Sequence, residues 1–200
     1  MAISTYSELQ DAIAGWLHRD GDSTITERIP DFIRLAEARF NRVLRTRGML
    51  ESLASTPLVS GAAALPAGFL AFKELRCDAS PSYTLQPKPL DWVRNQGTLA
   101  TLPLHFAVTG DEVVCWPSSG SVLRAYYKQI PALADNATNW LLTAHPDLYL
   151  FASLVESALF TQDDSRIPLW AEKAAALIEQ VQSQDNANAI NGGPLTARAR

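Results

Sequence analysis

Residues 105–128, HFAVTGDEVVCWPSSGSVLRAYYK, decide the fold class because apolar and polar side chains alternate in short runs between turn residues. A period of two is typical of strands with one buried face. Gly110-Asp111 predicts a two-residue hairpin loop with a positive φ at the glycine, and Pro117-Ser118-Ser119-Gly120 predicts a second hairpin. We therefore expect a three-stranded meander over His105–Thr109, Glu112–Trp116 and Val122–Lys128.

Proline and glycine recur throughout residues 49–129 and divide this segment into short pieces. Within it, Phe72–Asp78 and Tyr83–Gln86 predict two further strands. Since no helical period interrupts these runs, residues 49–129 are expected to form a β-rich insertion.

In the residues before this insertion, apolar side chains recur with the spacing typical of helices. Thr5 and Glu8 have the spacing of a capping box, which predicts a helix over residues 6–18. Pro30 suits the first turn of a second helix, predicted over residues 30–46 with one apolar and one basic face.

Helical patterns return after Pro131. A short capped turn is predicted at 138–142, followed by a helix over 146–162 whose apolar residues surround the helix axis. Such a pattern favours a central, buried helix. A last helix is predicted to end near residue 187, with Trp170 on its apolar stripe.

These elements predict a mainly α protein with inserted β structure. The helical core, a bundle of about four helices, is expected to comprise residues 1–48 and 130–188. Residues 49–129 would form a β meander or small barrel-like insertion, and residues 189–200 a flexible C-terminal tail.

Composition excludes several classes of protein. The 200 residues are 47% hydrophobic and carry a formal charge of −4, which argues against a disordered polymer and against a protein that coats nucleic acid by bulk charge. The sequence has no apolar run of transmembrane length, and residues 1–7 lack the pattern of a signal peptide, so we expect synthesis in the cytoplasm and no membrane partner.

Catalytic motifs are absent from the sequence. It contains no nucleophile elbow, phosphate-binding glycine loop or zinc-protease helix, so we expect no enzyme and no catalytic residue. Its cysteines and histidines are spread along the chain without ligand spacing, which predicts no metal site and no cofactor. Glu156, on the predicted central helix, is expected to pair with an arginine or to lie at a subunit contact.

Two basic features remain as candidate binding sites. The first is a group of arginines in and after the second predicted helix, opposed by only Asp31 and Glu37; its members are Arg34, Arg39, Arg42, Arg45 and Arg47. They are interpreted as solvated surface, as inter-subunit ion pairs, or as contacts to a polyanion. The second is the C-terminal segment with Gly192, Gly193, Pro194, Leu195, Arg198 and Arg200, which is either disordered or ordered on a partner.

An ordered set of segments resembles the head-to-tail adaptor proteins of tailed double-stranded DNA bacteriophages. The resemblance covers about residues 25 to 195 and includes no catalytic signature. The segments are Ile29–Arg42, Ala64–Leu70, Ile130–Leu133 with Thr138–Leu142, His145–Leu150 and Gly192–Leu195.

This resemblance implies a virion protein of the neck, made in the host cytoplasm. Its copies, about twelve, would form a ring on the portal vertex, retain packaged DNA and provide the attachment platform for the tail. The implied partners are the portal protein, neighbouring adaptor subunits, tail or nozzle proteins, and genomic DNA in non-specific proximity.

Specific roles for residues also follow from the resemblance. Gly192–Arg200 would bind the portal, and the arginines of the second helix would bridge subunits or line the channel. Two alternatives stay open: a tail-side completion or terminator protein, and a small DNA-binding regulator, although the sequence shows no helix-turn-helix and no basic balance.

Overall fold

The computed structural model describes residues 3–18, 21–161 and 166–190. It divides the chain into two compact units. One, the helical unit, comprises Met1–Gly48 and Ile130–Arg200; the other, the β unit, comprises Met49–Gln129. The β unit is therefore inserted in the sequence between the two parts of the helical unit, with the boundaries after residues 48 and 129.

The N-terminal part of the helical unit contains α1 (Tyr6–Trp16), α2 (Ser23–Thr26) and α3 (Ile29–Val43). The capping box predicted for α1 is confirmed, because the Thr5 side chain accepts from the Glu8 amide and the Glu8 carboxylate accepts from the Thr5 amide. It satisfies two amides that have no partner inside the helix.

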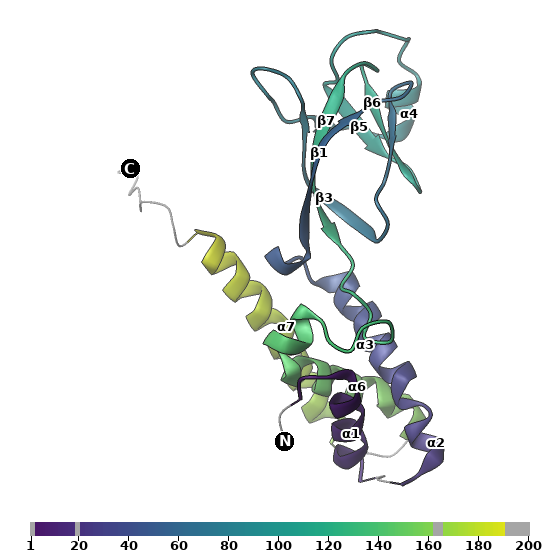
Figure 1. Ribbon diagram of the computed structural model, residues 1–200, viewed down its shortest axis with the longest axis vertical. Coiled ribbons are helices and arrows are strands. Elements are labelled where there is room, and N and C mark those ends of the chain that lie inside the picture. The colour runs from purple at the N-terminus through teal and green to yellow at the C-terminus, as the bar shows by residue number, and fades with distance from the viewer. Residues whose placement is uncertain (1–2, 19–20, 162–165, 191–200) are drawn as a thin grey trace. The chain divides into compact units, whose positions relative to one another are not determined.

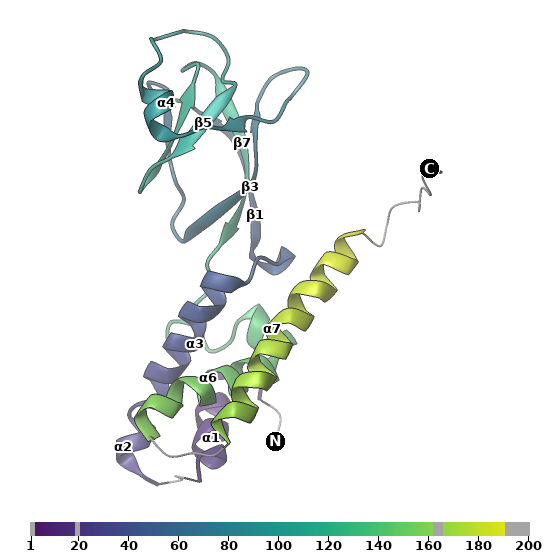
Figure 2. The same cartoon turned by 180° about the vertical axis from the view of Figure 1, so that it is seen from behind.

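The C-terminal part contains α5 (Trp140–Ala144), α6 (Pro146–Thr161) and α7 (Ile167–Ile190). As its apolar pattern predicts, α6 is central: it contacts α1, α3, α5 and α7 (Figures 1 and 2). Phe40 of α3 meets Tyr149 of α6 edge to face, with ring centroids 5.1 Å apart. Trp170 of α7 is also buried in this core.

The β unit contains two sheets. The first has the order β1-β7-β3 and is antiparallel throughout, with β1 Leu50–Pro57, β3 Phe69–Cys77 and β7 Ser121–Lys128. The second has the order β2-β6-β5-β4, with β2 Ala62–Ala64, β4 Gln86–Pro87, β5 His105–Val108 and β6 Glu112–Trp116. A short helix, α4 (Leu90–Arg94), lies between β4 and β5 in the sequence (Figure 1).

Side chains of both sheets form the core of the β unit, and they include Leu75, Cys77, Val113, Cys115 and Val122. Burial raises the pKa of the Cys115 thiol to about 12. Both cysteines are free and buried, so they pack as small apolar side chains rather than as nucleophiles.

The predicted fold class is wrong. About 45% of the residues that the structure describes are helical and 23% are strand in two sheets, which makes the protein a mixed α/β fold rather than a mainly α bundle with one insertion. The sequence did not predict two additional strands, because β1 is mostly exposed and β2 is short. Most side chains of β1 are exposed, and β2 has only three residues, so neither shows clear alternation.

Two turns explain the difference in sheet topology. The Gly110-Asp111 hairpin is present, since the Thr109 amide donates to the Glu112 carbonyl, but Gly110 does not have the predicted positive φ. Pro117–Gly120 is not a hairpin, because it leads from β6 in one sheet to β7 in the other. Of the expected meander, the β5–β6 antiparallel pair is therefore the part that forms around Gly110.

Several helix ends also differ from prediction, and α1 ends at Trp16 rather than at residue 18. α3 ends at Val43 rather than near residue 46, because Leu44 has extended backbone (ψ 140°) and buries its side chain completely. α7 continues to Ile190 and so includes the first two residues of the segment predicted as a tail.

Candidate assembly surfaces

The arginines that the sequence grouped on one helix lie in three different settings. Arg34, Arg39 and Arg42 belong to α3, whereas Arg45 and Arg47 follow its end. The structure therefore does not bring all five to one helical face.

Three of these arginines are held by contacts within the helical unit. Arg39 forms an ion pair with Glu156 of α6, with 3.8 Å between Nη1 and Oε1. Arg45 donates from Nη1 to the carbonyl oxygen of Asn41 at 2.9 Å, and also to that of Leu44. These bonds satisfy carbonyls at the C-terminal end of α3, where a cation also interacts favourably with the helix dipole.

Arg47 ties the end of this segment to α7. Its Nε lies 3.0 Å from Asp185 Oδ1, and its backbone amide donates to Asp185 Oδ2 at 3.0 Å. Both oxygens of the Asp185 carboxylate therefore accept from Arg47. The Asp185 side chain is largely shielded from solvent. This contact orients the C-terminal half of α7, which continues past α6 (Figure 2).

Arg34 and Arg42 differ from the other three. Both are exposed, and within the ranges that the structure describes neither has a hydrogen-bond or ion-pair partner. Leu35 and Val43 of the same helix are also exposed, at 48% and 44%. The outer side of α3 therefore combines unpaired positive charge with apolar surface, a combination common at protein interfaces.

Glu37 is a functional candidate that the sequence did not single out. It is 7% exposed, and its Oε1 accepts from the Leu133 amide at 2.9 Å and from the Tyr149 hydroxyl at 3.3 Å. Asn139 donates to the same hydroxyl at 2.7 Å. Burial raises the pKa of the Glu37 carboxyl, and the amide of Leu133 partly opposes that rise. The sequence could have indicated that Glu37 is buried, because it lies one turn after Ile33 and one turn before Phe40, and both of these residues are on the apolar face of the helix.

The β unit contains a second buried charge, Arg124 of β7, which is 7% exposed. It donates to the Ala64 carbonyl and, at 2.9 Å, to the Thr56 hydroxyl, so it joins strands of both sheets. Its Nε has no hydrogen-bond partner and is inaccessible to solvent. Arg124 is consequently a structural cross-link between the sheets rather than an exposed binding group.

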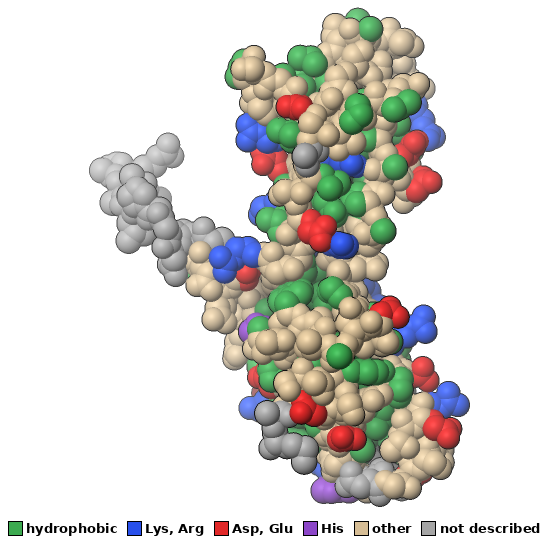
Figure 3. All heavy atoms as spheres, in the orientation of Figure 1, with side chains coloured by type: hydrophobic (Ala, Val, Ile, Leu, Met, Phe, Trp, Pro, Cys, Tyr) green, Lys and Arg blue, Asp and Glu red, His purple; other side chains and the backbone are tan. Residues whose placement is uncertain are grey.

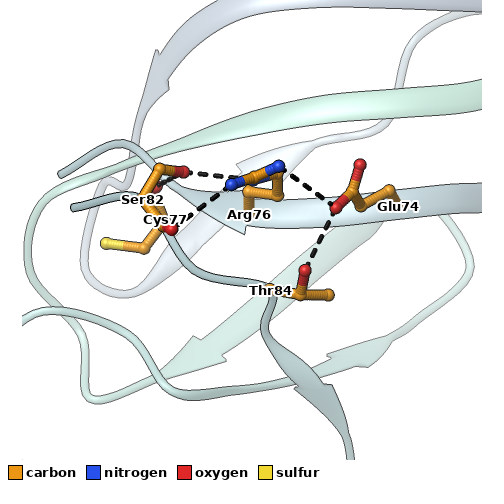
Figure 4. Close-up of polar contacts among 5 residues, drawn as sticks. All are labelled: Glu74, Arg76, Cys77, Ser82 and Thr84. Carbon is orange, nitrogen blue, oxygen red and sulfur yellow. Dashed lines mark hydrogen bonds and ion pairs between the residues drawn. The ribbon is translucent and has the colours of Figure 1, made fainter. Parts of the chain in front are cut away.

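A polar network on β3 fastens the segment that follows this strand (Figure 4). Arg76 forms an ion pair with Glu74, with 3.6 Å between Nη1 and Oε1, and donates from Nε to the Ser82 hydroxyl at 3.1 Å. Ser82 in turn donates to the Cys77 carbonyl at 2.8 Å, and Thr84 donates to Glu74 at 3.1 Å. Because these side chains bind one another and the Cys77 carbonyl, the network is interpreted as structural, holding residues 82–84 against β3.

His105 has a structural environment as well. Its ring stacks on Trp116, with a 6° angle between the planes, and meets Trp92 edge to face. Trp116 donates from Nε1 to the Gly97 carbonyl at 2.9 Å. No group of three or more His, Cys, Asp or Glu side chains suited to a metal occurs among the described residues.

The predicted portal-binding residues Gly192, Gly193, Pro194, Leu195, Arg198 and Arg200 lie outside the described residues. In the parts that are described, no helix has the length and apolar character needed to cross a bilayer. On the face drawn in Figure 3, Lys and Arg side chains are interspersed with Asp and Glu. This mixture is typical of a surface that binds proteins rather than of one that coats a polyanion.

Comparison with known proteins identifies the family. No curated protein matches the chain. The family model of the SU10 adaptor protein matches residues 4–198, which include the helical unit, the β unit and most of the C-terminal segment. Because this match spans nearly the whole sequence, the chain belongs to the SU10 adaptor protein family and is a structural adaptor of the phage virion.

Proposed function

We propose that the protein is a head-to-tail adaptor whose copies form a ring on the portal vertex. The ring would retain packaged DNA and give the tail its attachment platform. The observation that carries this proposal is the family match over residues 4–198. No other function is supported by so much of the chain.

The surface of the helical unit supports assembly between protein subunits. Exposed Leu35 and Val43 lie on the same helix as the unpaired Arg34 and Arg42. A single copy leaves this apolar surface in water, whereas a neighbouring copy would bury it. Burial stabilises the assembly by about 25 cal/mol for each Å² of apolar surface removed from water. Arginine at such a boundary also selects a partner with carboxylates.

The portal protein would be the first partner, and the C-terminal segment from Gly192 to Arg200 would reach it. Two features support this role. The segment follows α7, whose C-terminal half is mostly exposed and polar, and it carries Arg198 and Arg200 next to the Pro194-Leu195 pair. Tail or nozzle proteins would then bind the assembled ring, and DNA would pass it without sequence recognition.

Electron microscopy of the protein mixed with purified portal rings tests the proposal. We expect an added ring-shaped layer on one end of the portal, with the rotational symmetry of the portal or a divisor of it. A titration with several DNA duplexes at physiological salt is the matched control, and only weak, sequence-independent binding is expected. Portal rings that stay bare, together with nanomolar binding to one DNA sequence, would favour a regulator instead.

A further inference from the structure

A pocket of about 420 Å³ opens beside the N-terminal half of α3. Its charged and polar lining comes from Tyr6, Asp31, Arg34, Glu37 and Asp135. Three carboxylates thus face one arginine, and the pocket is acidic. All of these residues belong to the helical unit.

The carboxylate of Glu37 is incompletely satisfied. More than nine tenths of the residue is buried, and both of its hydrogen bonds, from Leu133 and Tyr149, go to Oε1. Across the described ranges, Oε2 has no hydrogen-bond donor from the protein and is not among the buried unpaired atoms, so it is open to solvent in the pocket, and no cation lies within ion-pair distance of either oxygen. Oε2 is therefore a free acceptor at the wall of the pocket, and an entering guanidinium can donate to it.

The unpaired Arg42 lies on the outer side of the same helix. Asp31, Leu35, Ala38 and Arg42 follow one another at spacings of four, three and four residues, so they form one stripe. Arg42 is separated from Glu37 by five residues, which rotates the two side chains about 140° apart around the helix axis. The guanidinium and the pocket on one α3 therefore face different directions.

We infer that the Glu37 pocket receives the Arg42 side chain of a neighbouring copy of this chain. This inference rests on the proposed ring. Two different surfaces of the same protein then meet, the acidic pocket of one copy and the basic part of α3 on the next. Such a heterologous contact is the type that closes into rings. Arginine suits the pocket because its planar guanidinium can bind a carboxylate through two hydrogen bonds.

The experiment measures how much adaptor binds to portal rings, by sedimentation of mixtures at increasing adaptor concentration. Glu37→Gln removes the charge but keeps an oxygen that accepts from Leu133 and Tyr149, so the fold is preserved. Arg42→Glu reverses the exposed charge. We expect each variant to need at least about tenfold more protein for half-saturation, with an unchanged far-UV circular dichroism spectrum.

A matched control and a charge exchange make the test specific. Lys173→Glu, on the exposed surface of α7, changes the net charge as Arg42→Glu does and should bind like the wild type. Asp135→Arg at the pocket should weaken binding alone. Combined with Arg42→Glu it should restore most of the binding, because the exchanged charges again attract across the contact.

The outcomes separate the pocket from the proposed function. If wild-type rings form on the portal and both Glu37→Gln and Arg42→Glu bind equally well, the pocket contact is overturned while the adaptor proposal stands. The same holds if the charge exchange gives no recovery. If the wild type itself never binds the portal or itself, both the ring and the contact are overturned.

Discussion

Trp170 shows how one residue supports the helical unit. Its ring is 1% exposed, and the Arg166 guanidinium lies 4.9 Å from the ring centroid. Trp170→Ala leaves a large cavity, so we expect the free energy of unfolding to fall by about 3–5 kcal/mol. Urea unfolding of the free protein measures this change. Leu169→Ala, at a neighbouring side chain that is 55% exposed, is the control and should cost less than about 1 kcal/mol. An equal, small loss for both variants would place Trp170 outside the core.

Glu37 gives the free protein a pH dependence with a definite sign. Burial first, and then Asp135, raise the pKa of its carboxyl in the folded state, while Leu133 and Tyr149 lower it in part. Tyr6 and Arg34 also line the pocket around it. Because the folded state holds this proton more tightly than the unfolded state, its contribution to stability is present below the ordinary carboxyl pKa. It is lost as pH rises through the raised value.

Glu37→Gln cannot lose this proton, so the variant should gain stability over the wild type as pH rises from about 4 to 7. Unfolding in urea at a series of pH values measures the difference. A difference that stays constant over this range would show that Glu37 titrates normally. Greater stability of the free variant combined with weaker assembly would mark Glu37 as a group kept for assembly rather than for folding.

The end of α3 illustrates what an element requires beyond its apolar pattern. The sequence predicts the helix and its buried face, but it does not show where Leu44 turns into extended backbone to bury its side chain. Arg45 then bonds to the Asn41 carbonyl and stabilises the helix end. We expect Arg45→Gln to lower the free energy of unfolding by about 1 kcal/mol, and Arg42→Gln by less than about 0.5 kcal/mol. Thermal melts of the two variants compare these residues directly, and equal melting temperatures would contradict the assigned role of Arg45.

The C-terminal segment is the element through which we propose that the protein attaches to the portal. Residues 192–200 contain two glycines, a proline and no helical period, so they are not expected to contribute to either core. Deleting them should leave the melting temperature unchanged and weaken portal binding by at least about tenfold. Calorimetry and sedimentation with portal rings measure the two effects. Undiminished portal binding, or a melting temperature lowered by several degrees, would refute this role.

Elements with strong local signals could be predicted from the sequence. The capping box at Thr5 and the apolar residues around α6 depend on neighbours within a turn or two, and both predictions are confirmed. Strands β1 and β2 could not be predicted, because exposed or very short strands show little alternation. Pro117–Gly120 has the residues of a hairpin turn, but turn residues do not determine which sheet the following strand joins, and β7 joins a different sheet from β6.

The candidate site was predictable only in part. The sequence identified an excess of arginine around α3, but charge counting cannot show that Arg39 and Arg47 bind carboxylates brought near by the fold, or that Arg45 bonds to carbonyls at the end of its own helix. It also treated Glu37 only as one of two acids that oppose these arginines. Only the packing of α3 against residues 131–149 shows that this carboxylate is buried and lacks a cation.

At the scale of the whole molecule, both units belong to one family match, whereas the proposed assembly surfaces lie on the helical unit. The mixed surface charge in Figure 3 and the net charge of −4 suit a protein that assembles around DNA without gripping it. A ring would bury the exposed apolar side chains of α3 and satisfy the unpaired charges beside them. Assembly on the portal is thus the property from which the other predictions about partners follow.

The most direct test of this account is the mass of the complex between the protein and purified portal rings, measured by light scattering after size-exclusion chromatography. We expect a single species in which the added mass equals about twelve copies of the 21.9 kDa chain per portal ring. Portal rings that elute at their own mass, with the protein running separately at every ratio tested, would contradict the account.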